Sequence, residues 1–263
     1  MGALIYGDTA AAAYDEQMRR VTQGFAPFLL RAARLAPGHR VLDIATGTGL
    51  AAEVAVDALG PTGHLVAADI SPAMLAKARE RLGEHLNVSF SLEDGQSLSF
   101  PDKSFDVVMC SLGLMFFPNP RRGLAEFHRV LRPGARAAVS VTTTVERSFN
   151  GQIIVVIGRH VPALAEAAER FFSLGDAARL DLLFREAGFT DVDVTTVSLS
   201  FAFPSFDAYF EPYERGGGAG GQAYIALPED LRRTVREEVR RLVGTTDGPV
   251  ELHSRLRIGS GRR

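Results

Sequence analysis

The chain has 263 residues, with 29 basic and 31 acidic side chains and a formal net charge of −2. This near balance argues against nucleic acid as the main partner, because a phosphate-binding surface needs an excess of Lys and Arg. The single cysteine, Cys110, excludes disulfides, a cysteine-rich zinc site and paired-thiol redox chemistry. The first residues lack the layout of a signal peptide, and the longest aliphatic run, 153–157, is too short to span a bilayer. We therefore expect a cytoplasmic protein with no membrane span.

The first half of the chain alternates between predicted helices and predicted strands. Apolar residues at helical spacing predict two helices at the start, over 9–20 and 22–35, and Pro37-Gly38 ends the second. Buried-type apolar runs predict strands over 40–45, 63–68, 86–92, 105–111 and 135–143. Helices are predicted between them over 50–59, 71–82 and 121–131. Strict alternation of this kind implies a parallel sheet that is covered by helices on both faces.

The second half has a different character. It is predicted to be helical over 162–187, a half-buried strand over 192–203, and helical again over 206–243 with a glycine loop inside. A final strand over 250–259 is expected at the edge of the sheet. We interpret the chain as a single domain with four parts: an N-terminal helical cap (1–36), an α/β core (37–203), a lid (204–246) and a final edge strand (247–263).

A glycine turn joins the first strand to the next helix. Gly47 and Gly49 allow close approach of a ligand to the backbone, and the helix that follows offers free N–H groups and the positive end of its dipole. Such a turn holds an anionic group, either a carboxylate or a pyrophosphate. Asp69 ends the second strand 22 positions after Gly47 and can accept hydrogen bonds from both ribose hydroxyls. The sequence therefore predicts a ribose-bearing ligand on this turn.

The turn alone fits two cofactors. Residues 47–52 match the glycine-x-glycine-x-x-alanine pattern of dinucleotide sites, with Asp69 as the acidic partner. However, Asp43 in the first strand would repel a pyrophosphate, whereas it suits the amino group of S-adenosylmethionine (SAM). Asp94 follows the third strand, where it can accept from an adenine amino group. The chain has only two lysines and no tyrosine–lysine pair of the short-chain dehydrogenase type. These features favour SAM, with an NAD-dependent oxidoreductase as the alternative.

Four stretches, 41–49, 66–82, 93–120 and 126–141, resemble the class I SAM-dependent methyltransferases, in particular those similar to the ubiquinone/menaquinone C-methyltransferases. The resemblance covers about residues 10 to 145. It implies an α/β, Rossmann-like, doubly wound sheet of seven strands in the order 3-2-1-4-5-7-6, the last strand antiparallel. N-terminal helices and a helical lid insertion would complete this fold.

The resemblance also implies a set of cofactor-binding residues that follow the first strands. The set is Asp43, Ala45, Gly47, Gly49, Asp69, Ile70, Met74, Asp94, Gly95, Ser111 and Tyr14. Asp69 would bind the ribose, and Ile70 and Met74 would pack on the adenine. Tyr14 would lie near the cofactor carboxylate. Ala45 stands where the family has its first glycine.

An apolar loop after the fourth strand is the candidate acceptor site. Met115, Phe116 and Phe117 are expected to form a pocket wall, because ligands bind at the carboxyl ends of strands in open α/β sheets. Tyr209 and Tyr213 at the start of the lid are further candidates. We expect a methyltransferase that acts on a small, moderately hydrophobic acceptor such as a quinone, phenol or polyketide. The other hypothesis is a SAM-binding protein without turnover.

The sequence identifies no catalytic base. Tyr14, Tyr213 and His253 are the candidates, but methyl transfer does not oblige the enzyme to supply a strong base. The six histidines are scattered and no pair has metal-ligand spacing, so we expect no metal. The oligomeric state stays open, with a homodimer as one option.

Overall fold

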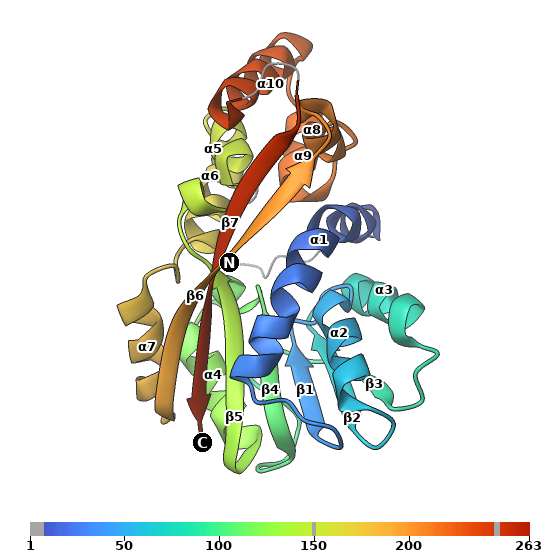
Figure 1. Cartoon of the computed structure of the whole chain (residues 1–263), viewed down its shortest axis with the longest axis vertical. Coiled ribbons are helices and arrows are strands. Elements are labelled where there is room, and N and C mark those ends of the chain that lie inside the picture. Colours follow the sequence, from blue (N-terminus) through green and yellow to red (C-terminus); the bar gives the residue numbers. More distant parts are fainter. Residues whose placement is uncertain (1–7, 149–150, 245–247) are drawn as a thin grey trace.

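The computed structural model describes residues 8–148, 151–244 and 248–263. Within these ranges seven strands form one sheet in the order β3-β2-β1-β4-β5-β7-β6 (Figure 1). The strands are β1 (Arg40–Ile44), β2 (His64–Asp69), β3 (Val88–Leu92), β4 (Phe105–Ser111), β5 (Leu131–Thr142), β6 (Thr190–Phe203) and β7 (Val250–Arg262). Strands β1 to β5 run parallel, and β7 is antiparallel to both of its neighbours. The predicted strand order is therefore confirmed.

The helices cover both faces of this sheet (Figure 1). They are α1 (Asp8–Ala32), α2 (Leu50–Leu59), α3 (Pro72–Leu82), α4 (Pro120–Val130), α5 (Gly151–Gly158), α6 (Pro162–Phe171), α7 (Ala177–Glu186), α8 (Phe206–Glu214), α9 (Gly218–Ile225) and α10 (Glu229–Val243). Short 3₁₀ turns are η1 (Leu114–Phe116) and η2 (Val145–Arg147). Helices α1 and α2 pack on one face, and α4 and α7 pack together on the other.

The central strands are apolar throughout because both of their faces are buried. In β4, Val107 and Met109 pack into the core under α1 and α2, whereas Val108 and Cys110 pack into the core under α4. Successive side chains of a strand point to opposite faces, so a strand between two helical layers needs apolar residues at every position. This is the pattern that predicted the parallel sheet.

The prediction that the final strand lies at the sheet edge is wrong. Strand β7 pairs with β5 over Leu256–Arg262 and with β6 along its whole length, so β6 forms the edge. The hydrophobic pattern of β7 indicates a strand but does not say which strands pair with it. The final strand inserts between β5 and β6 because the chain returns antiparallel after the helical segment that follows β6.

A two-stranded ribbon carries the upper half of the molecule. Pairing of β5 with β7 ends at Thr142↔Leu256, but β6 and β7 stay paired as far as Phe203↔Val250. The ribbon therefore extends beyond the sheet, and α8, α9 and α10 follow at its tip (Figure 1). Helix α5 packs against α6, α9 and α10. We call the group formed by α5, α6, α8, α9 and α10 the cap. It is distinct from the N-terminal helical cap that was predicted over 1–36. Helices α8 to α10 belong to the predicted lid segment, and α5 and α6 lie outside that segment.

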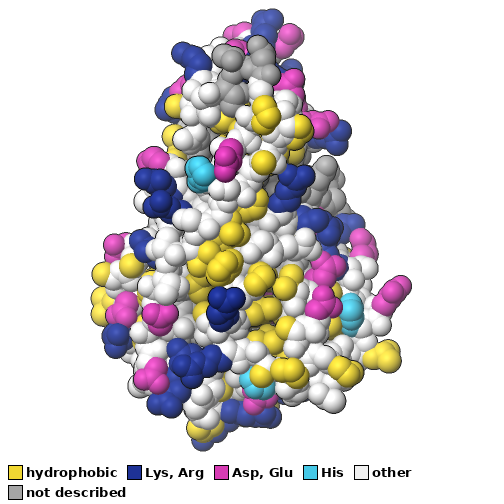
Figure 2. Space-filling view, in the orientation of Figure 1, with side chains coloured by type: hydrophobic (Ala, Val, Ile, Leu, Met, Phe, Trp, Pro, Cys, Tyr) yellow, Lys and Arg dark blue, Asp and Glu magenta, His cyan; other side chains and the backbone are white. Residues whose placement is uncertain are grey.

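Helix α1 replaces the two helices that were predicted at the start of the chain. Met18, Val21, Phe25 and Leu29 recur at helical spacing and are all buried, which makes one continuous apolar face across the predicted break. Within the described ranges no helix has the length and apolar character that a bilayer-crossing segment needs. On the face in Figure 2, basic and acidic side chains are interspersed, and hydrophobic side chains gather near its middle.

Candidate functional site

A pocket of about 210 Å³ lies over the carboxyl ends of β1 to β4. Its lining comes from the segments that follow these four strands. The lining residues are Ile44, Ala45, Gly47, Asp69, Ile70, Ser71, Met74, Glu93, Asp94, Gly95, Gln96, Ser111, Leu112, Gly113, Phe116, Phe117 and Pro118. This is the edge of an open parallel sheet at which ligands bind.

The glycine turn between β1 and α2 forms one wall of this pocket. Gly49 has a φ of 82° and stands directly before α2. A Cβ on Gly49 would lie 3.1 Å from a methyl carbon of Leu82, so a larger residue would strain the backbone and require the Leu82 side chain to shift. The first N–H groups of α2 follow this turn directly.

Asp69 closes the turn from the end of β2. One carboxylate oxygen accepts from the Gly47 backbone N–H at 2.8 Å, and the other accepts from the Ser71 N–H at 2.9 Å. Burial raises the pKa of Asp69, and backbone hydrogen bonds from Ser71, Gly47 and Ile70 oppose this rise. The carboxylate also lines the pocket, where a ligand hydroxyl can donate to it.

Asp43 lies behind the pocket in β1 and is fully buried. One of its oxygens accepts from the Thr46 hydroxyl at 2.7 Å, whereas the other has no hydrogen-bond partner among the described residues. Burial raises the pKa of this carboxyl from its ordinary value of 3.8 to about 7, and the nearby charge of Asp69 adds to the rise. A buried carboxylate with a free oxygen fits a cationic amino group, which would supply the missing donor.

The loop after β3 forms the opposite end of the pocket. Asp94 lines the pocket and accepts from the Gln96 backbone N–H at 2.9 Å. Glu93 accepts from both the hydroxyl and the N–H of Ser99, which holds the loop in shape. A Cβ on Gly95 would lie 2.4 Å from the Phe117 ring, so only glycine permits this ring to lie on the loop. This end of the pocket therefore combines the Phe117 ring with the carboxylates of Glu93 and Asp94.

The segment after β4 forms the far wall. Ser111 lines the pocket and its hydroxyl lies 3.3 Å from that of Ser140. Leu112 has a φ of 54°, a strained conformation for a branched residue, and its N–H donates to the Ser140 carbonyl at 3.0 Å. Phe116 follows in η1 and packs on Phe171 of α6 at a ring distance of 5.8 Å. The wall therefore connects the pocket to the cap.

Most of the predicted cofactor residues meet at this pocket. The residues that line it are Ala45, Gly47, Asp69, Ile70, Met74, Asp94, Gly95 and Ser111. Asp43 and Gly49 lie directly behind it. Tyr14 belongs to α1, but its side chain lies outside the described part of the structure. Glu93, Gln96 and Pro118 also line the pocket and were not predicted, although Gln96 directly follows the predicted Asp94-Gly95 pair.

The predicted acceptor residues lie in three places: the pocket, the core and the cap. Phe116 and Phe117 line the pocket, but Met115 is buried in the core. Tyr209 and Tyr213 do not reach the described pocket. They lie on the face of α8 that is buried inside the cap, because positions three and four apart on a helix share one face.

His253, a candidate base, also lies away from the pocket. Its Nδ1 is 2.8 Å from the Ser200 hydroxyl on the β6–β7 ribbon.

The sheet order, with its antiparallel β7 and its pocket over the first four strands, defines the class: a Rossmann-like methyltransferase fold. A methyltransferase domain model matches residues 41–134. The chain is 32% identical over 203 residues to a demethylmenaquinone methyltransferase from Clavibacter sepedonicus, covering 71% of this chain and 81% of the relative. It is 42% identical over 115 residues to a ubiquinone/menaquinone biosynthesis C-methyltransferase from Ectopseudomonas mendocina, covering 43% and 45%.

Among solved structures, a phosphoethanolamine N-methyltransferase from Haemonchus contortus matches with a TM-score of 0.63 and 17% identity. The match covers 98% of this chain and 58% of that one, which was solved with S-adenosylhomocysteine (SAH). The chain belongs to the class I SAM-dependent methyltransferases, in the subgroup of the ubiquinone/menaquinone C-methyltransferases. This membership decides the question that the glycine turn leaves open: the cofactor is SAM and not NAD.

Proposed function

We propose that the protein transfers the SAM methyl group to a small aromatic or quinone-like acceptor, in the cytoplasm. The observation that carries the proposal is the composition of the pocket wall. Carboxylates and backbone N–H groups surround one part of the pocket, whereas Phe116 and Phe117 form an aromatic part beside Ser111 and Leu112. Flat apolar acceptors fit such a wall. The demethylmenaquinone methyltransferase relative, by its name, acts on a compound of this class.

We assign the cofactor roles from the contacts of each side chain. Asp69 binds the ribose hydroxyls, because it lines the pocket and its carboxylate is already oriented by Gly47 and Ser71. Ile70 is 44% exposed, unusually high for a large apolar side chain, and covering the adenine would remove this surface from water. Asp94 accepts from the adenine amino group. The free oxygen of Asp43 accepts from the amino group of the methionine moiety, directly or through a bound water.

The chain's own contribution to the reaction is positioning and exclusion of water. When bound, SAM supplies an activated methyl group on a sulfonium. Ser111 and the Leu112–Gly113 backbone hold the wall beside which the acceptor lies, and the Ser140 hydrogen bonds keep that wall rigid. Phe116 and Phe171 close the pocket toward the cap. Fixing both reactants in this way can supply roughly 7–11 kcal/mol of the barrier, so no side chain has to act as a strong base.

The experiment is a radiolabel transfer assay from SAM to three acceptor groups: reduced quinones and phenols, amines, and thiols. We expect transfer to the first group. Phe116→Ala should raise the acceptor KM roughly tenfold with little change in the SAM KM, because a buried aromatic contact contributes on the order of 1–2 kcal/mol. Phe90→Ala is the matched control, since Phe90 is a half-buried ring on β3 beside Arg79, outside the pocket. Turnover of amines or thiols without any transfer to quinols or phenols would contradict the proposal.

A further inference from the structure

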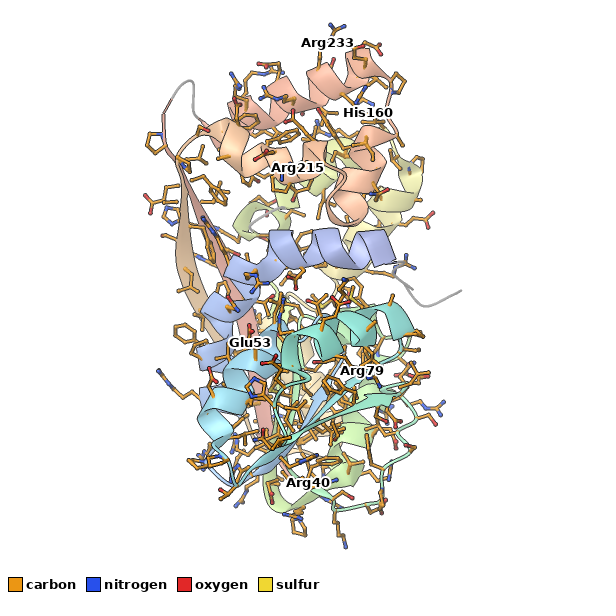
Figure 3. The ribbon with its side chains drawn as sticks, turned by 90° about the vertical axis from the view of Figure 1, so that its right-hand side faces the viewer. Arg40, Glu53, Arg79, His160, Arg215 and Arg233 are labelled. Carbon is orange, nitrogen blue, oxygen red and sulfur yellow. The ribbon has the colours of Figure 1, made fainter. Side chains whose placement is uncertain are left out.

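Helix α1 is held to the rest of the protein by apolar packing from Met18 onward and by polar contacts at Asp15. From Met18 onward it is anchored by apolar side chains that pack into the core, including Val21, Phe25 and Leu29. Asp15 lies one turn before this apolar anchor. In Figure 3, α1 lies between the cap and the layer that contains α2, with its labelled Glu53, and α3. The structure places α1 in contact with α2, α3, α8 and α9.

Asp15 makes a compact set of contacts with the cofactor side of the molecule. Its carboxylate accepts from the Thr48 hydroxyl at 2.6 Å and from one guanidinium nitrogen of Arg81 at 2.7 and 2.8 Å. Thr48 stands between Gly47 and Gly49, so this hydrogen bond ends on the cofactor-binding turn itself. Arg81 belongs to α3, the helix that packs against the turn.

The contacts of Asp15 are shielded from water. Thr48 is 2% exposed, and the side chains of Arg81 and Asp15 are 10% and 18% exposed. Burial opposes ionisation of Asp15, but the hydrogen bonds from Thr48 and Arg81 outweigh it and lower the pKa of this carboxyl. Charge-assisted hydrogen bonds in such a setting are about twice as strong as neutral ones. The alternative acid for Arg81, Glu53, lies 3.8 Å away.

We propose that Asp15 is a positioning residue that couples the docking of the first turns of α1 to cofactor binding. The hydrogen bond from the Thr48 hydroxyl connects the glycine turn to Asp15 on α1. Arg81 holds the Asp15 carboxylate in place. Since linkage is reciprocal, a cofactor that stabilises the turn also stabilises the docked helix. Loss of the docked helix then lowers the affinity for the cofactor by the same factor.

The test compares Asp15→Asn with wild type by two measurements. Calorimetric titration gives the SAH affinity, and hydrogen exchange gives the protection of residues 8–20 with and without SAH. In wild type, SAH should increase protection of this segment. Asp15→Asn should weaken SAH binding roughly tenfold and abolish the SAH-dependent protection, because the buried Thr48 and Arg81 donors lose their charged acceptor.

Arg19→Gln is the matched control. Arg19 also pairs with Asp15, at 2.9 Å, but its side chain is 47% exposed, and among the described residues its hydrogen bond and ion pair go to Asp15 and not to the turn or α3. Exposed pairs of this kind contribute little, so this variant should keep SAH affinity within about twofold of wild type.

Thr48→Val provides a second route, since it removes the hydroxyl and preserves the shape of the side chain. Combined with Asp15→Asn it should be strongly non-additive, because both changes delete the same link. Wild-type SAH affinity in a folded Asp15→Asn variant would overturn the proposal. Additive effects of the two substitutions, or wild-type protection of residues 8–20 that SAH does not change, would overturn it as well.

Discussion

The cofactor side of the sheet and the cap are built by different means. The proposed cofactor pocket is shaped mainly by backbone: the turns after β1 to β4, and the N–H groups of Gly47 and Ser71, which orient the Asp69 carboxylate. The cap is held together by side chains, with Phe206, Tyr209 and Phe210 packed in its interior and exposed ion pairs around them.

This difference indicates which region determines cofactor affinity and which region determines the stability of the cap. Backbone turns tolerate few changes, because their geometry depends on strand ends and on glycines at close approach. Aromatic packing tolerates change of identity so long as volume is kept. We therefore expect substitutions in the pocket to act on cofactor affinity, and substitutions in the cap interior to act on stability.

The largest expected effect is on the cap. Phe210 is fully buried and contacts Phe206, Tyr213 and Tyr224. Phe210→Ala should lower the free energy of unfolding by about 3–5 kcal/mol, measured by urea denaturation, because it removes a buried ring and leaves a cavity. SAH affinity of the folded variant should stay within about twofold of wild type. A large loss of SAH affinity would show that the two regions are not separable.

Asp69→Ala tests the cofactor side. The variant loses the acceptor for the Gly47 N–H and the proposed acceptor for the ribose hydroxyls, so SAH binding should weaken by roughly 1–3 kcal/mol in calorimetric titration. Asp57→Ala is the control, since Asp57 is an exposed carboxylate on α2. Equal affinities for the two folded variants would contradict the ribose assignment.

The buried Asp43 predicts a pH dependence of cofactor binding. Its pKa of about 7 in the folded protein lies above the ordinary 3.8, so below pH 7 the carboxyl is protonated and binding of a cationic amino group must release that proton. SAH affinity should therefore rise by about tenfold per pH unit below 7 and level off above it. Titrations in buffers of different ionisation enthalpy would count the proton released. In Asp43→Asn the slope should vanish; an unchanged slope would rule out Asp43 as its source.

The same pKa shift makes a prediction for stability without cofactor. Between pH 3.8 and about 7 the folded state holds a proton on Asp43 that the unfolded state has lost. The contribution of this residue to stability is thus complete below pH 3.8 and is lost as pH rises through about 7. When wild type and Asp43→Asn are denatured with urea over this pH range, the free energy of unfolding should decline less with rising pH in the variant. An identical decline would contradict the shifted pKa.

The smallest expected effect concerns Ala45 on the cofactor turn. Its φ of 56° is a strained conformation for alanine and an easy one for glycine. Ala45→Gly should raise the free energy of unfolding by up to about 1 kcal/mol, since relief of strain exceeds the extra chain entropy. Thermal denaturation measures this change; a lower melting temperature would contradict the role of backbone strain at this position.

The sequence predicted those features that depend on residues close together in the chain. Strands buried on both faces, the glycine turn and Asp69 at the end of β2 all follow from neighbours in the chain, and the structure brings these residues to one pocket. Contacts between distant segments were not predictable in this way. Asp15 and Thr48 are 33 positions apart, and nothing in either segment signals their hydrogen bond. The burial of Tyr213 inside the cap likewise depends on how whole helices pack. The pairing of β7 with β5 followed from the resemblance to a known family and not from the local pattern of the strand, which placed it at the sheet edge.

The central claim is that SAM lies across the ends of β1 to β4 with its ribose on Asp69. A crystal structure of the protein with SAH tests it most directly. We expect the adenine beside Ile70 and Met74, the ribose hydroxyls on the Asp69 carboxylate, and the amino group within reach of Asp43. Electron density for the adenosyl group away from this pocket, or a ribose without contact to Asp69, would contradict it.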